Sequence, residues 1–472
     1  MNRKALGMMV ALLLCGCAPV GPDYQPQALE TPARWANNPD VQKPATNLAQ
    51  TAWWRAFNDP VMNGLIDQAV AANLGLEQAK ARITQARASV VLASVPGLPQ
   101  LNAAGAVTRS RRSDNLAASG SGQTSTLYQA GFDAGWELDL FGGVRRSVES
   151  AQARLEASIE ELHAATLTLL GDVAKNYIDL RARQALLEIT RNNLAAQQDT
   201  VDLTRERYRF GLNSYLDVTQ AEAQRTFTAS NIPPLVAAIK ASMHRLAILL
   251  ARPPAALTTE LAPPHPLPVA DGLLVPGLPA ELLARRPDLR AAERQLAAAS
   301  ADIGVATAEL YPTFDLTLGL GLQANSASTF AQRASRYWSI VPGVAMPLYD
   351  GSRARANIQV KQAIYDESLA RYRAAYNTAL EDVENGLAAY YAERDRNRVL
   401  TESVRVSEES VALSLDRYRR GLTTFLDVQS AQRALYAAQS TLTESKGQQL
   451  TNLIALHKAL GGGWQVSMQK IQ

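Results

Sequence analysis

Two long stretches of this chain carry apolar or aromatic residues at every seventh position, apart from Thr166 and Asn397, and the two stretches repeat the same pattern. Residues 144–210 and 352–420 contain no proline and one glycine each. A sustained seven-residue period is what a helix needs to pack in a left-handed coiled coil. Each stretch therefore predicts one helix of about 67 residues, roughly 100 Å long at ~1.5 Å per residue. The columns are Ile159, Thr166, Val173, Leu180, Leu187, Leu194, Val201 and Tyr208, and, each 210 positions later, Leu369, Tyr376, Val383, Tyr390, Asn397, Val404, Val411 and Tyr418.

Nearly identical dodecapeptides end the two stretches, RYRFGLNSYLDV at 207–218 and RYRRGLTTFLDV at 417–428. Gly211 and Gly421 stand where a helix stops in the left-handed conformation, after a last turn rich in arginine that suits the helix dipole. An S/T-x-x-D pattern follows each glycine, and this pattern predicts a capping box that opens a new helix. Each dodecapeptide therefore predicts the tip of a helical hairpin.

The helices that return from the tips are shorter than the long helices by nearly half. Asp59 followed by Pro60 is an N-cap with proline at N1, and it predicts a shorter helix that covers the rest of the first long helix. A second short helix is its counterpart in the other copy. The predicted helices are 60–95, 144–210 and 215–250 in the first copy, and 278–309, 352–420 and 425–460 in the second.

Segments before each long helix alternate between apolar and polar or small residues, clearly at 128–140, 313–323 and 338–348 and more weakly at 101–107, which predicts strands with one apolar face. Such strands fit a transmembrane barrel with a wet lumen, although a half-buried soluble sheet gives the same alternation. Four strands cannot close a barrel, and open edges are not tolerated in lipid, so the chain must oligomerise. Eight strands from a dimer and twelve from a trimer are both allowed. Aromatic residues at the strand ends favour the membrane interpretation; they are Trp136, Phe141, Tyr311, Trp338 and Tyr349.

The N-terminus predicts export. Arg3 and Lys4 precede an apolar run of about ten residues, which is too short to span a bilayer. The four residues that end at Cys17 resemble a bacterial lipobox, so we expect cleavage after Gly16 and lipidation of Cys17; an ordinary signal peptide cut nearby is the alternative. Ala18 differs from the aspartate of inner-membrane retention, which makes the outer membrane the expected destination.

Charge and composition exclude several functions. A net charge of +3, from 47 basic and 44 acidic residues, argues against a nucleic-acid partner. The four histidines are scattered, and no nucleophile, base and orienting group come together. Cys15 and Cys17 are the only cysteines, so the mature chain has no disulfide. We therefore expect no catalytic residues, no metal site and no cofactor.

A set of motifs across essentially the whole chain resembles the TolC-like outer membrane factors, in particular the NodT-type efflux lipoproteins. The motifs are GPDY at 21–24, WWRAF with DP at 53–60, ELDLFGG at 137–143, ELLARRPDLRAAE at 281–293, GLxxxLDV at both tips and HKALGGGW at 457–464.

The resemblance implies a fold that is mainly helical with membrane strands. Three protomers would share a 12-stranded outer-membrane β-barrel, four strands each, continuous with a long periplasmic α-helical barrel. The implied function is a passive exit duct of a tripartite efflux system for drugs or other toxic compounds. The implied partners are a homotrimer, a periplasmic adaptor, an inner-membrane transporter of the resistance-nodulation-division type, and outer-membrane lipid. The expected parts are a signal peptide at 1–16, a lipid-anchored equatorial segment at 17–58, repeats at 59–250 and 278–460, a proline-rich equatorial linker at 251–277 and an equatorial tail at 461–472.

In the family the hairpin tips form the periplasmic gate and the contact with the adaptor. Ser430 and Thr423 stand where the family's namesake has a second aspartate and a locking arginine, so its cation block and lock are not expected here. Two alternatives stay open: the aspartates and arginines act only as helix caps, or the protein is a structural or adhesive spacer without transport. The gate candidates are Tyr208, Asp217, Arg417, Tyr418, Arg419 and Asp427, and the adaptor-contact candidates are Gly211, Leu212, Gly421 and Leu422.

Overall fold

The computed structural model describes residues 19–37, 52–115, 122–269 and 285–465. The chain divides into two compact units, and each unit takes segments from both sequence copies. The domain boundaries expected from the repeat therefore do not coincide with the compact units, and they stay a prediction about the repeat itself. Unit 1 consists of residues 1–28, 82–159 and 291–373, and unit 2 of residues 29–81, 160–290 and 374–472.

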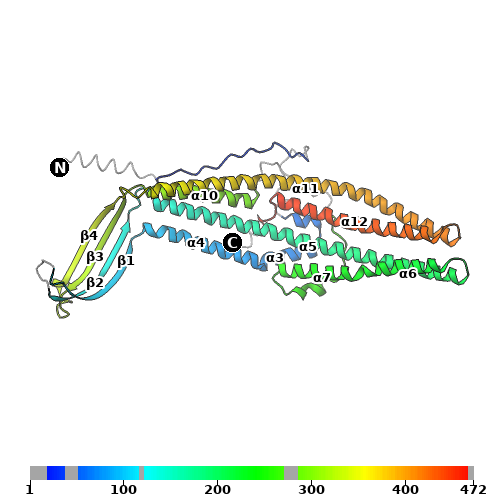
Figure 1. The fold of residues 1–472 in the computed structure, drawn as a ribbon, viewed down its shortest axis with the longest axis horizontal. Coiled ribbons are helices and arrows are strands. Elements are labelled where there is room, and N and C mark those ends of the chain that lie inside the picture. Colours follow the sequence, from blue (N-terminus) through cyan, green and yellow to red (C-terminus); the bar gives the residue numbers. More distant parts are fainter. Residues whose placement is uncertain (1–18, 38–51, 116–121, 270–284, 466–472) are drawn as a thin grey trace. The chain divides into compact units, whose positions relative to one another are not determined.

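Unit 1 contains a four-stranded antiparallel sheet in which the strands lie in chain order (Figure 1). The outer strands β1 and β4 each pair with a strand on one side only, among the described residues. The sheet therefore presents two open edges. Its strands are β1 (Gln100–Arg111), β2 (Thr124–Glu137), β3 (Thr313–Ala324) and β4 (Arg336–Ala345).

The register of the strands gathers the apolar residues on one face of this sheet. Phe132 is opposite both Ala103 of β1 and Leu320 of β3, and Leu320 is opposite Trp338 of β4. Because successive side chains of a strand point to opposite faces, these residues share one face. The other face carries polar and small residues such as Asp133, which lies opposite Gly319. The predicted alternation is thus confirmed across all four strands.

The two long helices, α5 (Gly143–Arg209) and α11 (Arg353–Arg419), have 67 residues each. Their bounds lie within a residue of those that the heptad columns predicted. Apolar heptad residues are buried along both helices, for example Val173 and Leu180 of α5 and Val383 of α11, each with no exposed area. The seven-residue period therefore marks a packed face of each helix.

The return helix of the first copy is not continuous, and that prediction was wrong. It consists of α6 (Tyr215–Ser230) and α7 (Ile232–Leu249), which meet at Asn231 just before Pro233 and Pro234. Proline has no amide hydrogen, so it is tolerated in the first turn of a new helix but not in a helix interior. The second copy has no proline here, and α12 (Phe425–Ala459) runs unbroken for 35 residues.

Residues Tyr215–Leu249 together form the one described helical stretch whose length and hydropathy would allow a bilayer crossing. The junction at Asn231 divides that stretch into helices of 16 and 18 residues. Neither reaches the about 20 residues that a transmembrane helix needs. We therefore assign α6 and α7 to the helical hairpin and not to a membrane span.

The short helix of the first copy is also divided, into α3 (Pro60–Ala72) and α4 (Leu74–Ser94). Asp59 caps α3 as predicted, because its carboxylate accepts from the amides of Val61 and Met62 at 2.9 Å. Asn73 opens α4 by accepting from the amides of Gly75 and Leu76. The single predicted helix is corrected to two because this asparagine acts as a second N-cap.

The remaining elements are short, apart from one helix of the second copy. That helix, α10 (Pro287–Ala308), covers the described part of the predicted 278–309, since residues 278–284 lie outside the described residues. The short elements are η1 (Trp53–Phe57), η2 (Val95–Gly97), η3 (Pro254–Leu257), α8 (Thr258–Leu261) and η5 (Arg333–Ser335).

Chain segments near both termini pack against the helices of unit 2 through two indole–imidazole stacks. Trp53 stacks on His457 with ring centroids 5.2 Å apart, and its Nε1 donates to the Gly462 carbonyl at 3.2 Å. Trp464 stacks on His163 at 4.4 Å, with the Arg290 guanidinium over its ring. Four of these side chains are buried, which makes them part of the core of unit 2.

In unit 1, residues 20–24 are fixed to the start of α5 and to α10. The buried guanidinium of Arg146 donates to the Val20 carbonyl at 3.0 Å and to the Asp23 carboxylate at 2.7 Å. Gly21 has φ +90°, and a Cβ there would lie 2.4 Å from the Cα of Gly304. Tyr24 donates to Glu293 at 2.6 Å. This segment begins a few residues after Cys17, which itself lies outside the described residues.

Candidate functional site at the hairpin tips

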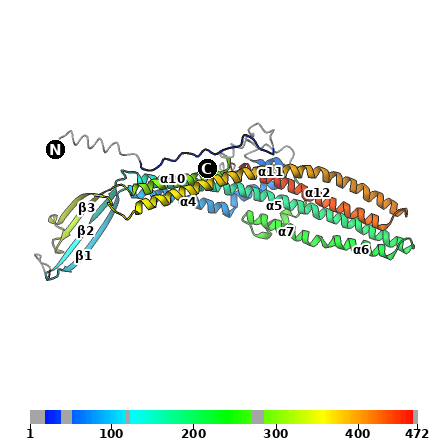
Figure 2. The ribbon, with the colours of Figure 1, turned by 45° about the horizontal axis from the view of Figure 1, so that its top comes forward.

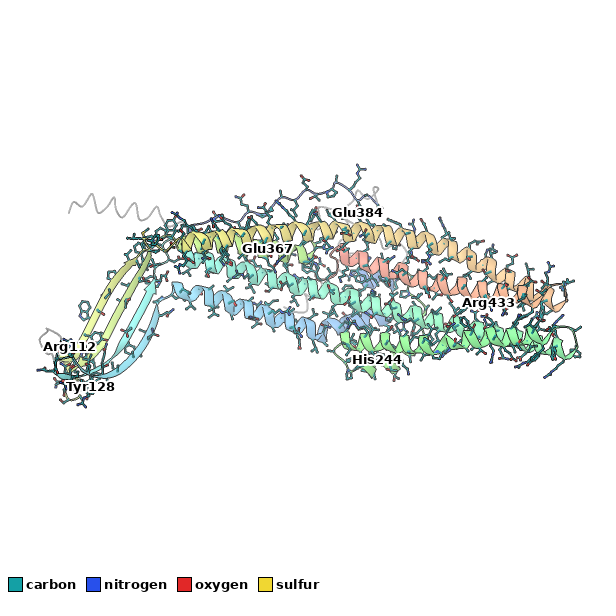
Figure 3. All side chains as sticks on the ribbon, in the orientation of Figure 1. Arg112, Tyr128, His244, Glu367, Glu384 and Arg433 are labelled. Atoms are coloured by element: carbon teal, nitrogen blue, oxygen red, sulfur yellow. The ribbon has the colours of Figure 1, made fainter. Side chains whose placement is uncertain are left out.

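Within unit 2, α6 lies beside α5 and α12 lies beside α11 in both orientations of the ribbon (Figures 1 and 2). We call α5 with α6 the first hairpin and α11 with α12 the second hairpin, and residues 207–218 and 417–428 the first tip and the second tip. The counterpart of a residue in the first copy is the residue 210 positions further along the chain. Figure 3 labels Arg433 of the second hairpin, whose Nε donates to the Gln224 amide oxygen of the first at 2.5 Å.

Both tips end their long helix with the same backbone motif. Gly211 has φ +76° and Gly421 has φ +73°. The Gly211 amide donates to the Tyr208 carbonyl at 2.9 Å, and the Leu212 amide donates to the Arg207 carbonyl at 2.9 Å. The second tip repeats both bonds from Gly421 and Leu422, at 3.0 and 2.9 Å. This is a Schellman motif, and it explains why each tip requires glycine.

Gly211, Leu212, Gly421 and Leu422 all lie on the exposed surface of the tips. The two leucine side chains expose 62% and 63% of their area. Both leucine side chains are therefore accessible to another protein. Their role as adaptor-contact residues nevertheless stays a prediction.

The predicted capping box is present at the second tip. The Asp427 carboxylate accepts from the Thr424 amide at 3.1 Å and from the Thr424 hydroxyl at 2.9 Å, and it also accepts from the Thr423 hydroxyl. These donors hold the pKa of Asp427 below its usual range, with the Thr423 hydroxyl first among them. Asp427 is therefore a helix cap in this structure, and it is ionised at neutral pH.

The first tip is capped differently, so its predicted capping box needs correction. Ser214 accepts from the Leu216 amide at 3.0 Å. The Asp217 amide reaches only the Ser214 backbone carbonyl, at 3.1 Å. Among the described residues the Asp217 carboxylate accepts no hydrogen bond. The Ser214 hydroxyl is the side-chain acceptor at this helix start, so the charge of Asp217 is not used in the cap.

Tyr418 joins the two hairpins of one chain. Its ring is 3% exposed and packs in an apolar cluster with Val201, Ala221 and Phe425. The Arg207 guanidinium carbon lies 4.8 Å from the centre of this ring, and the Arg207 Nη1 donates to the Arg419 carbonyl at 3.0 Å. Sequence reasoning placed Tyr418 at the gate but treated Arg207 only as a helix-dipole partner.

Asn213 is the residue of this contact that sequence reasoning missed. Its side-chain amide donates to the Tyr418 hydroxyl at 3.1 Å and to the Thr204 carbonyl at 3.2 Å. Burial raises the pKa of Tyr418 above its usual value, although the Asn213 hydrogen bond lowers it. The signal was present in the sequence, because position 213 is one of few places where the dodecapeptides differ.

The other gate candidates do not form one cluster. Arg417 and Asp427 line an open groove of about 400 Å³ on the side of the second hairpin. Arg419 lines a different groove, which lies between the two hairpins. Tyr208 is 46% exposed and contacts Tyr215, with ring centroids 5.4 Å apart. The structure thus brings Arg417 together with Asp427, whereas Asp217 acts electrostatically on Tyr418 and Tyr208 contacts Tyr215.

Arg112 and Tyr128 are labelled near the end of the sheet where the chain passes from β1 to β2 (Figure 3). Tyr128 is opposite Val107 of β1 and Ala324 of β3. Trp136 at the opposite end of β2 is 40% exposed, and its Nε1 donates to the Gly97 carbonyl at 3.0 Å. Aromatic residues near both ends of a strand are typical of membrane–water interfaces.

In the described part of the chain, no cluster of three or more His, Cys, Asp or Glu side chains could hold a metal ion. His163 and His457, the two described histidines that are buried, are both stacked on tryptophan. The expectation that the protein has no catalytic residues, metal or cofactor stays an expectation.

Comparisons with known proteins agree with this arrangement. A family model described as outer membrane efflux protein matches residues 65–251 and 278–462. Nodulation protein T of Rhizobium leguminosarum bv. trifolii is 32% identical over 454 residues, covering 96% of each chain. The pyoverdine export outer membrane protein OpmQ of Pseudomonas putida is 35% identical over 469 residues, or 98% of this chain and 97% of that protein.

Among solved structures, the outer-membrane channel OprN superposes with a TM-score of 0.89 at 32% identity, covering 94% of this chain and 99% of that one. The resemblance read from the sequence motifs is therefore confirmed. The chain belongs to the outer membrane efflux protein family and is an outer membrane channel of a bacterial efflux system.

Proposed function

We propose that three copies of this chain close one 12-stranded barrel and form a passive exit duct from the periplasm to the exterior. The observation that supports closure is the pair of open edges, β1 and β4, on a sheet whose register gives one apolar and one polar face. Unpaired backbone groups are too costly in lipid, so β1 of one copy must pair with β4 of another. Three copies supply the twelve strands that the family resemblance implies.

The duct would be opened at the tips by a periplasmic adaptor, and an inner-membrane transporter of the resistance-nodulation-division type would drive export. The exposed Leu212 and Leu422 support adaptor contact. The gate candidates divide into groups with different tasks: Tyr418 fastens the two hairpins together, while Arg417, Arg419, Asp217 and Asp427 place charge at the tips. Within one chain, Tyr208 neither fastens the hairpins together nor carries a charge.

Two further features belong to the proposal. Lipidation at Cys17 would anchor the segment that Arg146 fixes to the start of α5. The cargo would be drugs or other toxic compounds, selected upstream of the duct. Relatives of similar identity are named for different cargoes, one for export of pyoverdine and another for efflux of toluene.

Single-channel conductance in a planar bilayer tests the gate. Asp427→Asn keeps an acceptor for the threonine donors but removes the charge, whereas Asp427→Ala removes both. Asp217→Asn removes a tip charge that caps nothing, so it tests the effect of tip charge without loss of a cap. Arg419→Gln tests the charge in the groove between the hairpins.

We expect a small wild-type conductance and a several-fold rise in Asp427→Asn, because tip charge and not the cap would close the mouth. A rise in Asp427→Ala alone would make Asp427 a cap and remove it from the gate. Equal currents from inserted oligomers of all forms would contradict gating at these residues. Absence of current from every form would contradict the duct.

A further inference from the structure

Arginine is concentrated at one end of the sheet of unit 1. At this end, which we call the loop end, the chain passes from β1 to β2 and from β3 to β4, whereas β2 and β4 continue into α5 and α11 at the other end. Residues 106–130 and 320–338 carry a net charge of +4, although the whole chain carries only +3. The charged residues of these two stretches are Arg109, Arg111, Arg112, Asp114, Arg333 and Arg336.

Arg336 lies on the apolar face of the sheet. It is opposite Leu322 of β3, which is opposite Ala130 of β2. Phe132 and Leu320, two positions further along these strands, occupy the same face because side chains alternate along a strand. A charged residue therefore begins β4 at a position where the alternation otherwise places apolar side chains.

Arg109 lies on the same face, nearer to the loop end. It is opposite Thr126 of β2, and Tyr128 lies between Thr126 and Ala130 on this face (Figure 3). Arg109 and Arg336 belong to the outer strands β1 and β4, with two strands between them. At ~4.8 Å between strands and ~3.3 Å per residue, their Cα atoms are roughly 20 Å apart along the sheet. One small anion therefore cannot meet both side chains.

Neither of these two arginines has a partner for its charge. In the described part of the chain, no ion pair or side-chain hydrogen bond involves the guanidinium of Arg109 or Arg336, and both residues are exposed. The one aspartate of the loop end, Asp114, pairs with Arg111 at 3.2 Å. A cation on a lipid-facing surface is costly unless it meets an anion. The two guanidiniums are thus available to anions outside the chain.

An open hollow of about 600 Å³ lies beside Arg336 on the apolar face. Small side chains leave this space, because Ala103, Gly105 and Ala130 lie next to bulkier neighbours. An apolar lining with one cation at its edge suits an acyl chain whose head group is anionic. The bulkier side chains around the hollow are Phe132, Leu320 and Leu322.

We propose that the loop end binds a glycolipid with two phosphate groups and several acyl chains, the lipid class of the outer leaflet of the outer membrane. One acyl chain occupies the hollow, Arg336 binds one phosphate, and Arg109 binds the other. Two phosphates are required because the two arginines are too far apart to share one.

The chemistry of the charged residues agrees with this ligand. All five cations of the two stretches are arginine and none is lysine. The planar guanidinium donates paired hydrogen bonds that match the oxygens of a phosphate. The inference rests on the barrel proposed above, in which the helices lie in the periplasm, the loop end faces the exterior and the apolar face of the sheet meets lipid.

Lipid binding by the detergent-solubilised oligomer of the full chain tests the site. The probes are bisphosphorylated lipid A, its monophosphorylated form and phosphatidylglycerol, and native mass spectrometry counts the lipids retained as each probe is titrated. Arg336→Gln and Arg109→Gln each remove a proposed phosphate ligand, whereas Ala130→Leu fills the hollow without a change of charge.

Arg333→Gln is the matched control. It removes the same charge three residues before Arg336, but Arg333 belongs to η5 and does not line the hollow. Single-channel conductance of each variant in a planar bilayer establishes that it still assembles, so a loss of lipid binding is separated from a loss of folding.

We expect the wild type to retain bisphosphorylated lipid A at a several-fold lower concentration than either other probe. Arg336→Gln, Arg109→Gln and Ala130→Leu should each weaken this binding several-fold, and Arg333→Gln should leave it nearly unchanged. Equal retention of lipid A and phosphatidylglycerol, or equal retention by all variants, would overturn the site. Conducting oligomers that retain no lipid A would overturn the site and leave the duct standing. Failure of the wild type to form oligomers would overturn both.

Discussion

The side-chain amide of Asn213 donates to the hydroxyl of Tyr418 at 3.1 Å, and this bond joins the two hairpins of one chain. The tyrosine ring is buried, so its hydroxyl depends on this partner. The bond connects residues 205 positions apart at the tips, where the mouth of the duct is proposed to open.

Asn213→Ala removes this bond and the bond to the Thr204 carbonyl. We expect the tips to be less stable by about 1 to 2 kcal/mol, because a buried hydroxyl loses its partner. Faster hydrogen exchange of amides near the two tips would be the measured effect. Thr219→Ala is the control, since the Thr219 hydroxyl donates to the Leu216 carbonyl of its own helix and to no other group in the described part of the chain. Unchanged exchange in Asn213→Ala would show that the ring packing alone holds the hairpins together.

Gly211→Ala and Gly21→Ala separate backbone strain from steric conflict. Both glycines have positive φ, which costs another residue about 1 to 2 kcal/mol. A Cβ on Gly211 meets nothing within 4 Å, but one on Gly21 would lie 2.4 Å from the Gly304 Cα. We expect a small fall in the thermal midpoint for Gly211→Ala and a clearly larger one for Gly21→Ala. Equal falls would mean that residues 20–24 can move away from α10 at little cost.

His457 makes stability depend on pH. Burial lowers its pKa from 6.5 to about 4, so the unfolded state binds a proton in this range and the folded state does not. Its contribution is fully present above pH 6.5 and is lost as the pH falls toward 4, by about 3 kcal/mol in all. His457→Phe keeps an aromatic ring on Trp53 and cannot titrate. We expect its thermal midpoint to fall less than that of the wild type between these pH values; parallel curves would assign the acid sensitivity to other groups.

Arg146→Lys tests how residues 20–24 are held. The guanidinium reaches the Val20 carbonyl, Asp23 and Glu149 with three different nitrogens, and one ammonium cannot reproduce that geometry. We expect a loss of about 2 kcal/mol in local stability, measured as faster protease cleavage within residues 20–24. Arg145→Lys, at the more exposed neighbouring position, is the control. Equal cleavage of the two variants would place the restraint elsewhere, for example at Tyr24.

Local chemistry explains why much of the fold could be predicted from the sequence. The long helices followed from the heptad columns, the tips from Gly211 and Gly421, and the strands from period-two alternation, because each depends on residues close together in the chain. The broken helices were missed although Asn73, Pro233 and Pro234 are visible in the sequence, since a cap or a proline in the middle of an apolar pattern is outweighed by that pattern.

Tertiary structure decided how the two copies differ. The sequence presents Tyr208 and Tyr418 as equals, and likewise Asp217 and Asp427. Packing in the folded chain buries Tyr418 under Arg207 and Asn213. The Asp427 carboxylate accepts hydrogen bonds from two threonine hydroxyls, whereas no such bond to Asp217 is found among the described residues. Burial and hydrogen bonding between segments about 200 positions apart depend on where the folded chain places each hairpin. No pattern within one copy can therefore decide which tyrosine is covered and which is exposed.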